Sequence, residues 1–162
     1  MEQFRIGQGT DIHVLTENRD FILGGVKIPY DKGFKAHSDG DVLIHAIIDA
    51  LFGALSLGDI GSHFPDTSPE YKDIDSSVLL KKTINIIREH NFEIVNLDTT
   101  VHAEAPKLRP YIDLIRKNLS EILFISEDKI SVKAKTSEGV DAVGQKLAVR
   151  AECIVLLQKT KG

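Results

Sequence analysis

The chain contains the run Val42-Leu43-Ile44-His45-Ala46-Ile47-Ile48-Asp49-Ala50-Leu51-Phe52, which decides how the rest must fold. Nearly every position in it is apolar or small, and the pattern predicts a helix over about residues 41–55. A helix that is apolar on all sides is buried, so the domain must be built around it. Asp41, His45 and Asp49 are the exceptions, and on a helical wheel they form one narrow polar stripe. These three side chains must therefore be satisfied inside the protein.

The sequence around this helix is acidic and lacks cationic side chains. No Lys or Arg occurs from residue 36 to residue 71, whereas six carboxylates and three histidines do. Buried carboxylates without a cationic partner either take up protons or bind another positive group. A metal ion held by His and Asp side chains meets this need, so we expect the chemical centre of the chain here.

Length and composition restrict the class of protein. The chain has 162 residues, of which 42% are hydrophobic and 27% charged, and its net charge is −4. These values predict a single domain, residues 1–162, and argue against nucleic acid or an anionic membrane as a partner. The single Cys153 excludes an intrachain disulfide and fits a reducing compartment. Because no leader precedes the first strand and no apolar run could span a bilayer, we expect a cytoplasmic protein.

The remaining periodicities predict an α+β fold. Strands are expected at residues 4–14, 21–28, 95–103, 130–134 and 147–158, with Gly24-Gly25 as a bulge in the second. Loops are expected at residues 29–37 and 64–75. Two amphipathic helices are expected, one capped by Ser76-Ser77 and one starting at Pro110. This order predicts one mixed sheet with helices on one face, which leaves the other face free for oligomerisation.

Two short motifs supply candidate metal ligands. Asp11 and His13 are two residues apart at the end of the first strand, so their side chains point the same way. His45 offers a third ligand, with Asp49 orienting its ring, and three protein ligands leave the fourth zinc position open for catalysis. The alternatives are an Asp–His hydrogen bond at the strand end and a core histidine held by Asp41 or Asp49.

Other polar residues point to an anionic ligand with hydroxyl groups. His37 and Ser38 precede the buried helix, whose N-terminus favours an anion, although Ser38 and Asp39 are also ordinary N-cap candidates. The turns Asp59-Ile60-Gly61 and Phe64-Pro65-Asp66 suit a polyol pocket, and the alternative is ordinary turn chemistry.

Two strand ends add cations and oxygen ligands. Residues 103–110 leave a strand and enter a helix, where nucleotides bind, and they carry Lys107 and Arg109. No P-loop motif is present. Residues 135–138 read Lys-Thr-Ser-Glu, which suits phosphate oxygens and a second, oxygen-preferring divalent ion.

Together these segments resemble the 2-C-methyl-D-erythritol 2,4-cyclodiphosphate synthase family over nearly the whole chain. The segments that carry the resemblance, in order, are residues 5–13, 23–30, 36–41, 58–61, 64–67 and 105–107. The resemblance implies that a phosphate on methylerythritol attacks the β-phosphorus of an attached cytidine diphosphate and expels CMP.

The family pattern also implies roles for individual residues. It assigns zinc to Asp11, His13 and His45, a bridging Mg²⁺ or Mn²⁺ to Glu138, and the catalytic positions to His37 and Thr136. The substrate-binding residues that it implies are Asp11, His13, His37, Ser38, Asp59, Ile60, Gly61, Phe64, Pro65, Asp66, Thr67, Ser68, Ala103, Glu104, Ala105, Pro106, Lys107, Leu108, Arg109, Lys135, Thr136, Ser137 and Glu138. It further implies a bacterial cytoplasmic homotrimer, with active sites between subunits and the sheets facing the threefold axis.

One segment departs from the family pattern. Many members read G-F-T-G-R-G-E-G where this chain reads Asp-Ala-Val-Gly-Gln-Lys-Leu-Ala at residues 141–148. The resemblance implies that these positions line a central cavity that takes isoprenoid diphosphates, so we expect either that this site is absent here or that it has a different occupant.

Two rival functions fit the same residues. A zinc-dependent phosphohydrolase acting on a nucleotide-linked polyol phosphate would use the same ligands, but no carboxylate stands out as its water-activating base. A non-catalytic nucleotide- or metal-binding module leaves the polar stripe at His45 and the two carboxylate turns unexplained.

Overall fold

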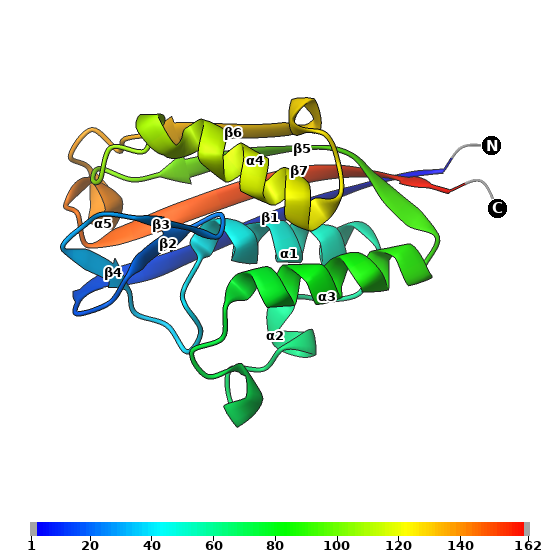
Figure 1. Ribbon diagram of the computed structural model, residues 1–162, viewed down its shortest axis with the longest axis horizontal. Helices are drawn as coiled ribbons and strands as arrows, with labels where there is room; N and C mark the ends of the chain where they lie inside the picture. Colours follow the sequence, from blue (N-terminus) through cyan, green and yellow to red (C-terminus); the bar gives the residue numbers. More distant parts are fainter. Residues whose placement is uncertain (1–2, 161–162) are drawn as a thin grey trace.

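The computed structural model describes residues 3–160, and its framework is one five-stranded sheet in the order β4-β1-β7-β5-β6 (Figure 1). The strands are β1 (Phe4–Glu17), β4 (Lys32–Phe34), β5 (Phe92–His102), β6 (Ile130–Lys135) and β7 (Ala148–Lys159). Strands β5 and β6 run parallel, and the other neighbours run antiparallel. The sheet is therefore mixed, as predicted.

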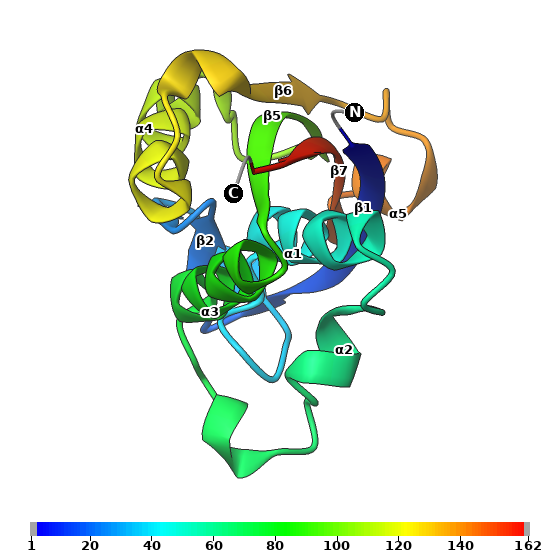
Figure 2. The ribbon, with the colours of Figure 1, turned by 90° about the vertical axis from the view of Figure 1, so that its right-hand side faces the viewer.

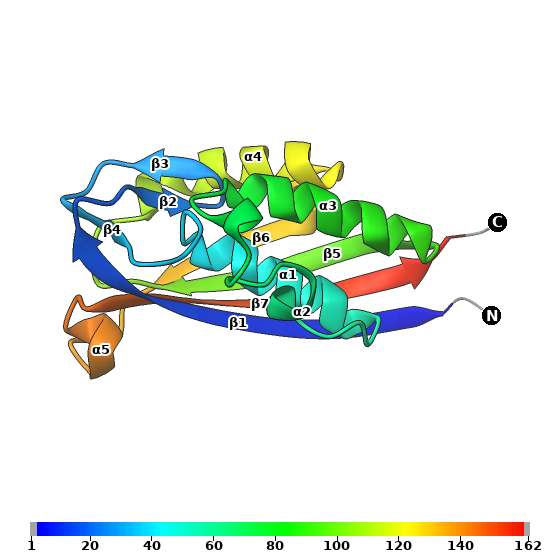
Figure 3. The ribbon, with the colours of Figure 1, turned by 90° about the horizontal axis from the view of Figure 1, so that it is seen from below.

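Three long helices cover one face of this sheet (Figures 2 and 3). They are α1 (Val42–Ala54), α3 (Ser76–Glu89) and α4 (Ile112–Leu123). The short helices are α2 (Ile60–His63) and α5 (Asp141–Gly144), and the 3₁₀ turns are η1 (Pro69–Tyr71), η2 (Arg109–Tyr111) and η3 (Glu127–Lys129). The predicted α+β class, with helices on one face, is confirmed.

Helix α1 is the centre of the core, as its sequence predicted. Eleven of its thirteen residues are buried, and the helix packs between the sheet and α3. Its N-cap is Asp41, whose carboxylate accepts a hydrogen bond from the Ile44 N–H, rather than Ser38 or Asp39. Helix α3 is likewise capped by Asp75 instead of Ser76 or Ser77. The observed caps lie one to three residues from the predicted ones, because several adjacent Ser and Asp side chains compete for each cap.

The close approach of β1 to α1 depends on two glycines of β1. A Cβ atom at Gly7 would lie 1.9 Å from the Ala50 carbonyl oxygen, and one at Gly9 would lie 2.0 Å from that of Ala46. Both neighbours are helix backbone, which cannot move aside without separating the helix from the sheet.

We therefore expect Gly9→Ala to lower the free energy of unfolding by about 1–3 kcal/mol or more, as overpacking does in a filled core. Urea denaturation measures this change. Gly53→Ala is the matched control, because the nearest atom to its Cβ would be the Gln8 carbonyl oxygen at 3.7 Å. That variant should gain up to about 1 kcal/mol from helix propensity. Equal stability of the two variants would contradict the packing argument.

The segment predicted as a single strand at residues 21–28 is a hairpin of two short strands instead. Strands β2 (Phe21–Leu23) and β3 (Val26–Ile28) pair with each other in a separate two-stranded sheet. Gly24 and Gly25 form the turn with φ of 58° and 74°, a conformation that reverses the chain instead of bulging it.

Two predicted loops also contain regular structure. Strand β4 lies within the predicted loop at residues 29–37. It forms because β1 continues to Glu17, and the last three residues of β1 pair with β4. The predicted turn after Gly58 continues into α2, and η1 interrupts the predicted loop 64–75.

The face of the sheet opposite α1, here called the open face, is partly apolar. Phe4, Ile6, Ile12 and Val14 of β1 and Ile154 of β7 are each at least 47% exposed. Cys153 directly precedes Ile154 in β7 and therefore points to the opposite, helix-covered side of the sheet. It is buried there, and burial raises the pKa of its thiol to about 12. Across the described residues, no helix combines the length and apolar character that a membrane span requires.

Candidate active site

Strand β1 and helix α1 bring three candidate metal ligands to one point. Asp11 Oδ2 lies 3.0 Å from His13 Nε2 and 3.1 Å from His45 Nδ1, and the two nitrogens lie 3.2 Å apart. Ligand atoms about 2.0–2.1 Å from a tetrahedral zinc ion lie about 3.3–3.4 Å from each other. The three atoms therefore already stand close to one face of a zinc tetrahedron, and they form a group able to hold a metal ion.

The charge at this point is that of an ionised carboxylate. Burial acts to raise the pKa of Asp11, but hydrogen bonds with His13 and His45 outweigh it and hold this pKa well below its usual range. Burial likewise acts to lower the pKa of His45, and the bond to Asp11 outweighs it and raises that pKa. An ionised oxygen and two imidazole nitrogens are a donor set that Zn²⁺ and similar divalent ions accept.

The far nitrogen of His45 makes hydrogen bonds that the sequence reasoning missed. Nε2 lies 2.9 Å from Ser76 Oγ and 3.3 Å from Ser38 Oγ. The Ser76 hydroxyl donates to Asp39 Oδ1, and the Ser76 N–H donates to Asp39 Oδ2. This chain of bonds turns the His45 ring so that Nδ1 faces Asp11. Such a partner fixes the tautomer of a ligating histidine.

Asp49, which was predicted to orient the His45 ring, has another role. Its Oδ1 accepts a hydrogen bond from the Ile60 N–H at 2.7 Å, so it fixes the start of α2. Asp41 is also structural: besides the Ile44 N–H, it accepts from the N–H groups of Gly24 and Gly25. Complete burial raises the pKa of Asp41 to about 6. Both alternatives in which Asp41 or Asp49 holds His45 are therefore wrong.

We expect Ser76→Ala to weaken zinc binding by about 10–100-fold, because His45 loses the partner that orients it. Competition with a fluorescent chelator measures the affinity. Ser77→Ala is the matched control, since Ser77 is the next residue of the same helix turn and is not among the described hydrogen-bond partners of the His45 ring. Equal affinities in the two variants would show that the Ser76 hydroxyl is dispensable.

The metal ligands open into a cavity of about 400 Å³. The other residues that line it are Ala36, His37, Ser38, Ile60, Gly61, Phe64, Asp66, Tyr71 and Leu79. His37 is half-buried and not an exposed loop histidine, and its Nε2 lies 3.0 Å from the Ser68 carbonyl oxygen. Helix α2 presents Gly61 to this cavity, while the exposed Asp59 caps that helix through Ser62. The structure thus gathers most of the predicted polyol and phosphate residues around the metal ligands.

The predicted nucleotide residues form a separate cavity of about 490 Å³. Its lining residues are Ala103, Glu104, Pro106, Lys107, Leu108, Arg109, Pro110, Ala134, Lys135 and Thr136. Glu138 lies beside it and accepts a hydrogen bond from the Thr136 hydroxyl at 2.7 Å, while Glu104 accepts one from the Ser137 N–H. No residue lines both cavities, so one chain holds the two halves of the predicted substrate site apart.

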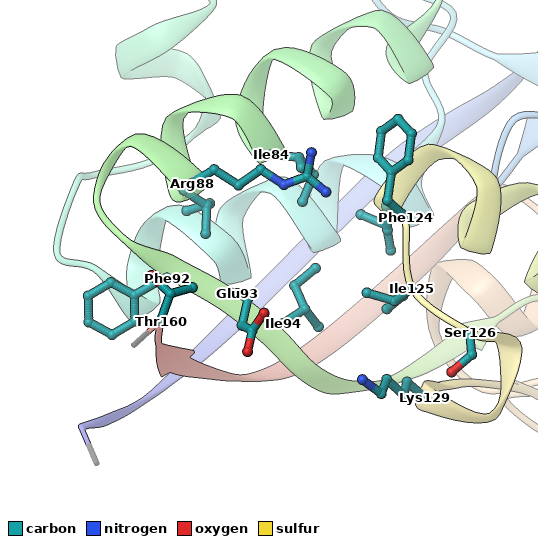
Figure 4. Close-up of a pocket in the computed structure, with 12 residues that line it drawn as sticks. Ile84, Arg88, Phe92, Glu93, Ile94, Phe124, Ile125, Ser126, Lys129 and Thr160 are labelled. Atoms are coloured by element: carbon teal, nitrogen blue, oxygen red, sulfur yellow. The ribbon is translucent and has the colours of Figure 1, made fainter. Parts of the chain in front are cut away.

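A third cavity, of about 350 Å³, lies between the ends of α3 and α4 and the start of β5 (Figure 4). Ile84, Ile87 and Ile94 are among its apolar residues, and the Arg88 guanidinium lies 4.9 Å from the centroid of the Phe124 ring at its rim. It shares no residue with the metal ligands, and we assign it no part in the site.

The segment that departs from the family pattern lies outside all three cavities. Residues 141–144 form α5, and the side chains of Ala142, Gln145 and Leu147 are exposed.

Fold and site together define a class of protein: an α+β domain with an Asp–His–His group, fit for a divalent ion, in the wall of a cavity. The sequence model of the YgbB family matches residues 4–158. The chain therefore belongs to the YgbB family.

Two similar proteins carry the same name. The chain is 55% identical to the 2-C-methyl-D-erythritol 2,4-cyclodiphosphate synthase of Fusobacterium nucleatum, over 97% of this chain and 98% of that protein. It is 54% identical to the synthase of Brachyspira hyodysenteriae, over 97% of this chain and 99% of that protein. The predicted resemblance is confirmed.

Solved structures agree with this assignment. IspF of Plasmodium falciparum in complex with CDP matches with a TM-score of 0.86 and 38% identity, over 98% of this chain and 97% of that chain. The bifunctional IspDF of Campylobacter jejuni matches with a TM-score of 0.96 and 39% identity, over 99% of this chain and 44% of that larger one.

Proposed function

We propose that this protein is a cyclodiphosphate synthase of non-mevalonate isoprenoid precursor biosynthesis. It converts 4-CDP-2-C-methyl-D-erythritol 2-phosphate into 2-C-methyl-D-erythritol 2,4-cyclodiphosphate and CMP. The observation that carries this conclusion is the Asp11–His13–His45 group in the wall of the 400 Å³ cavity, within a chain 55% identical to a synthase of this name.

The reaction needs positioning and charge neutralisation more than it needs a strong acid or base. An oxygen of the 2-phosphate attacks the β-phosphorus of the cytidine diphosphate group. The bond from that phosphorus to the bridging oxygen breaks, and the electron pair leaves with CMP. A divalent ion, Zn²⁺ in our proposal, bound by Asp11, His13 and His45, would supply positive charge to the phosphoryl group under attack.

The residues around the metal ligands hold the substrate in place. The Nε2–H of His37 is held by the Ser68 carbonyl oxygen, and in this proposal it would turn to donate to a phosphate oxygen, while Ser38 assists. Gly61, with no side chain, lets the erythritol approach the backbone of α2, and Asp66 accepts from its hydroxyl groups. The Phe64 ring closes the apolar side of the same cavity, which contains each of these residues.

The cytidine half of the substrate occupies the second cavity in this proposal. Lys107 and Arg109 face the phosphates, and Glu138 would hold a second ion, Mg²⁺ or Mn²⁺, which would supply positive charge to the diphosphate. The Thr136 hydroxyl, which donates to Glu138 in this chain, contacts the transferred phosphoryl group. An IspF structure with CDP among the relatives supports a cytidine diphosphate ligand.

The two separate cavities support a homotrimer in which neighbouring chains each supply one half of an active site. The open face supports it further, because exposed apolar side chains such as Ile6 and Ile154 need a partner.

The test is product analysis. Zinc-loaded protein with Mg²⁺ is incubated with 4-CDP-2-C-methyl-D-erythritol 2-phosphate and followed by ³¹P NMR. We expect two mutually coupled diphosphate signals of a cyclic product and a CMP signal in equal amount. An open-chain phosphate would replace the proposal with a zinc phosphohydrolase. Binding of CDP without turnover would replace it with a binding module.

A further inference from the structure

We propose that Arg19 is a positioning residue for this reaction, holding the His37–Ser38 segment in place from outside the cavity. The inference rests on the proposed function. Arg19 lies in the loop between β1 and β2 and lines neither of the two cavities that form the proposed substrate site. Its influence must therefore pass through the backbone that it contacts.

The Arg19 guanidinium joins three segments that are distant in sequence. Its Nε donates to the Phe34 carbonyl oxygen at 3.1 Å, at the end of β4. Its Nη2 donates to the Ser38 carbonyl oxygen at 2.6 Å, and its Nη1 donates to Asp73 Oδ1 at 3.2 Å. Strand β4, the segment before α1 and the segment before α3 are thereby held by one planar group.

The two loop segments also bond directly to each other. The Asp73 N–H donates to the His37 carbonyl oxygen at 2.7 Å, and the Asp39 N–H donates to the Ile74 carbonyl oxygen at 3.1 Å. Ser68, the hydrogen-bond partner of the His37 ring, belongs to the same connection between α2 and α3. A shift of that connection would therefore move His37 and its ring partner together.

This connection lies at the periphery of the fold. Figure 2 shows the chain between α2 and α3 extending away from the sheet. Asp73 itself has a φ of 55°, a left-handed conformation that is uncommon for a residue other than glycine. The backbone around Asp73 thus depends on its contacts, and Arg19 supplies the charged one.

A guanidinium suits this position for both charge and shape. Asp20, Asp31, Asp39 and Asp73 line the same surface cavity as Arg19, so an uncompensated group of carboxylates would repel one another there. The fork of N–H groups reaches two carbonyl oxygens and a carboxylate at once. A lysine has one ammonium on a flexible stem and cannot reproduce that geometry.

The experiment compares Arg19→Ala and Arg19→Lys with Arg116→Ala, measuring kcat, KM, CDP affinity, zinc content and Tm. Arg116 is the matched control, because its guanidinium donates to the carbonyl oxygens of Ile130 and Glu127 and faces Asp113 in the same manner. Arg116 joins α4 to β6 and contacts nothing in either cavity of the substrate site.

We expect kcat to fall by about 10–100-fold in both Arg19 variants, as displacement of a positioning group by about 1 Å can cause. CDP affinity should stay within about twofold of the original, because the cytidine residues lie in the other cavity, and zinc content should not change. Arg116→Ala should lower Tm by about as much as the Arg19 variants do and leave kcat unchanged.

Three results would overturn the inference: an unchanged kcat in Arg19→Ala, full activity in Arg19→Lys, or an equal loss of kcat in Arg116→Ala. The inference would also be overturned if CDP affinity, zinc content and Tm all fell together with kcat in the Arg19 variants, because general destabilisation would then explain the lower rate. Failure of the proposed function itself is distinguished by the unsubstituted protein, which would then form no cyclic product.

Discussion

His45→Ala is expected to lower the rate of cyclic product formation by about a thousandfold or more. The variant keeps Asp11 and His13, but two ligands on one strand cannot hold a divalent ion against water as three can. Metal stabilisation of phosphoryl charge is worth several kcal/mol, and each 1.4 kcal/mol corresponds to a factor of ten in rate. The ³¹P NMR assay gives the rate, and elemental analysis of the dialysed protein gives the zinc content, which should fall with it.

His90→Ala serves as the control for removing an imidazole. His90 is exposed at the end of α3, and its Nδ1 lies 2.8 Å from the Ile86 carbonyl oxygen, one turn earlier in the same helix. Its loss should leave rate and zinc content unchanged. Removing the metal from the unsubstituted protein with a chelator should reproduce the His45→Ala rate, and added Zn²⁺ should restore it. A His45→Ala protein with full activity would exclude the proposed metal centre.

The double variant Ile6→Glu with Ile154→Glu is expected to dissociate the assembly and abolish turnover. Both side chains lie on the open face, at 72% and 51% exposed in the single chain. In a trimer built on this face the new carboxylates would lose water and meet like charges from the neighbouring copies. Each buried unpaired charge costs several kcal/mol, enough to separate subunits at micromolar concentration.

Light scattering coupled to size exclusion measures the mass of each variant. The double variant should elute near the chain mass of 17.9 kDa, and the unsubstituted protein near three times that value. Leu114→Glu is the control, because Leu114 is 53% exposed but lies on α4, on the helix side of the sheet. A trimeric, active double variant would show that the open face is not the interface. A monomeric variant with full activity would show that one chain holds a complete site.

The elements with the strongest periodic patterns were predictable from the sequence. The buried helix α1, the amphipathic helices α3 and α4, and the long strands were each signalled by ten or so residues of consistent pattern. The short strands β2, β3 and β4 were not, because three residues carry no period. They exist because the extended end of β1 and the turn at Gly24-Gly25 offer them partners.

At the site, too, some residues could be predicted from the sequence and others could not. Asp11, His13 and His45 could be selected because their residue types and spacing on a strand and a helix restrict where their side chains point. Ser76 and Asp39 could not, because hydroxyls and carboxylates at helix starts are common and are usually caps. Asp49 was predicted to bond to His45 from its place on the helical wheel. In the structure the Asp49 carboxylate instead accepts a hydrogen bond from the N–H of Ile60, the first residue of α2.

The sequence by itself determined the buried helix, the α+β class, the family and the identity of the candidate metal ligands. Each of these depends on residue types at short, regular spacings. On a strand or a helix, such a spacing fixes the direction in which each side chain points. The tertiary structure alone decided which polar groups form hydrogen bonds with each other. Ser76 bonds to His45, Asp49 accepts from the first N–H of α2, and Arg19 joins three segments. It also decided that one chain separates the two halves of the proposed substrate site. Such pairings join residues far apart in the chain, and they are selected by the packing of whole elements, which no local pattern records.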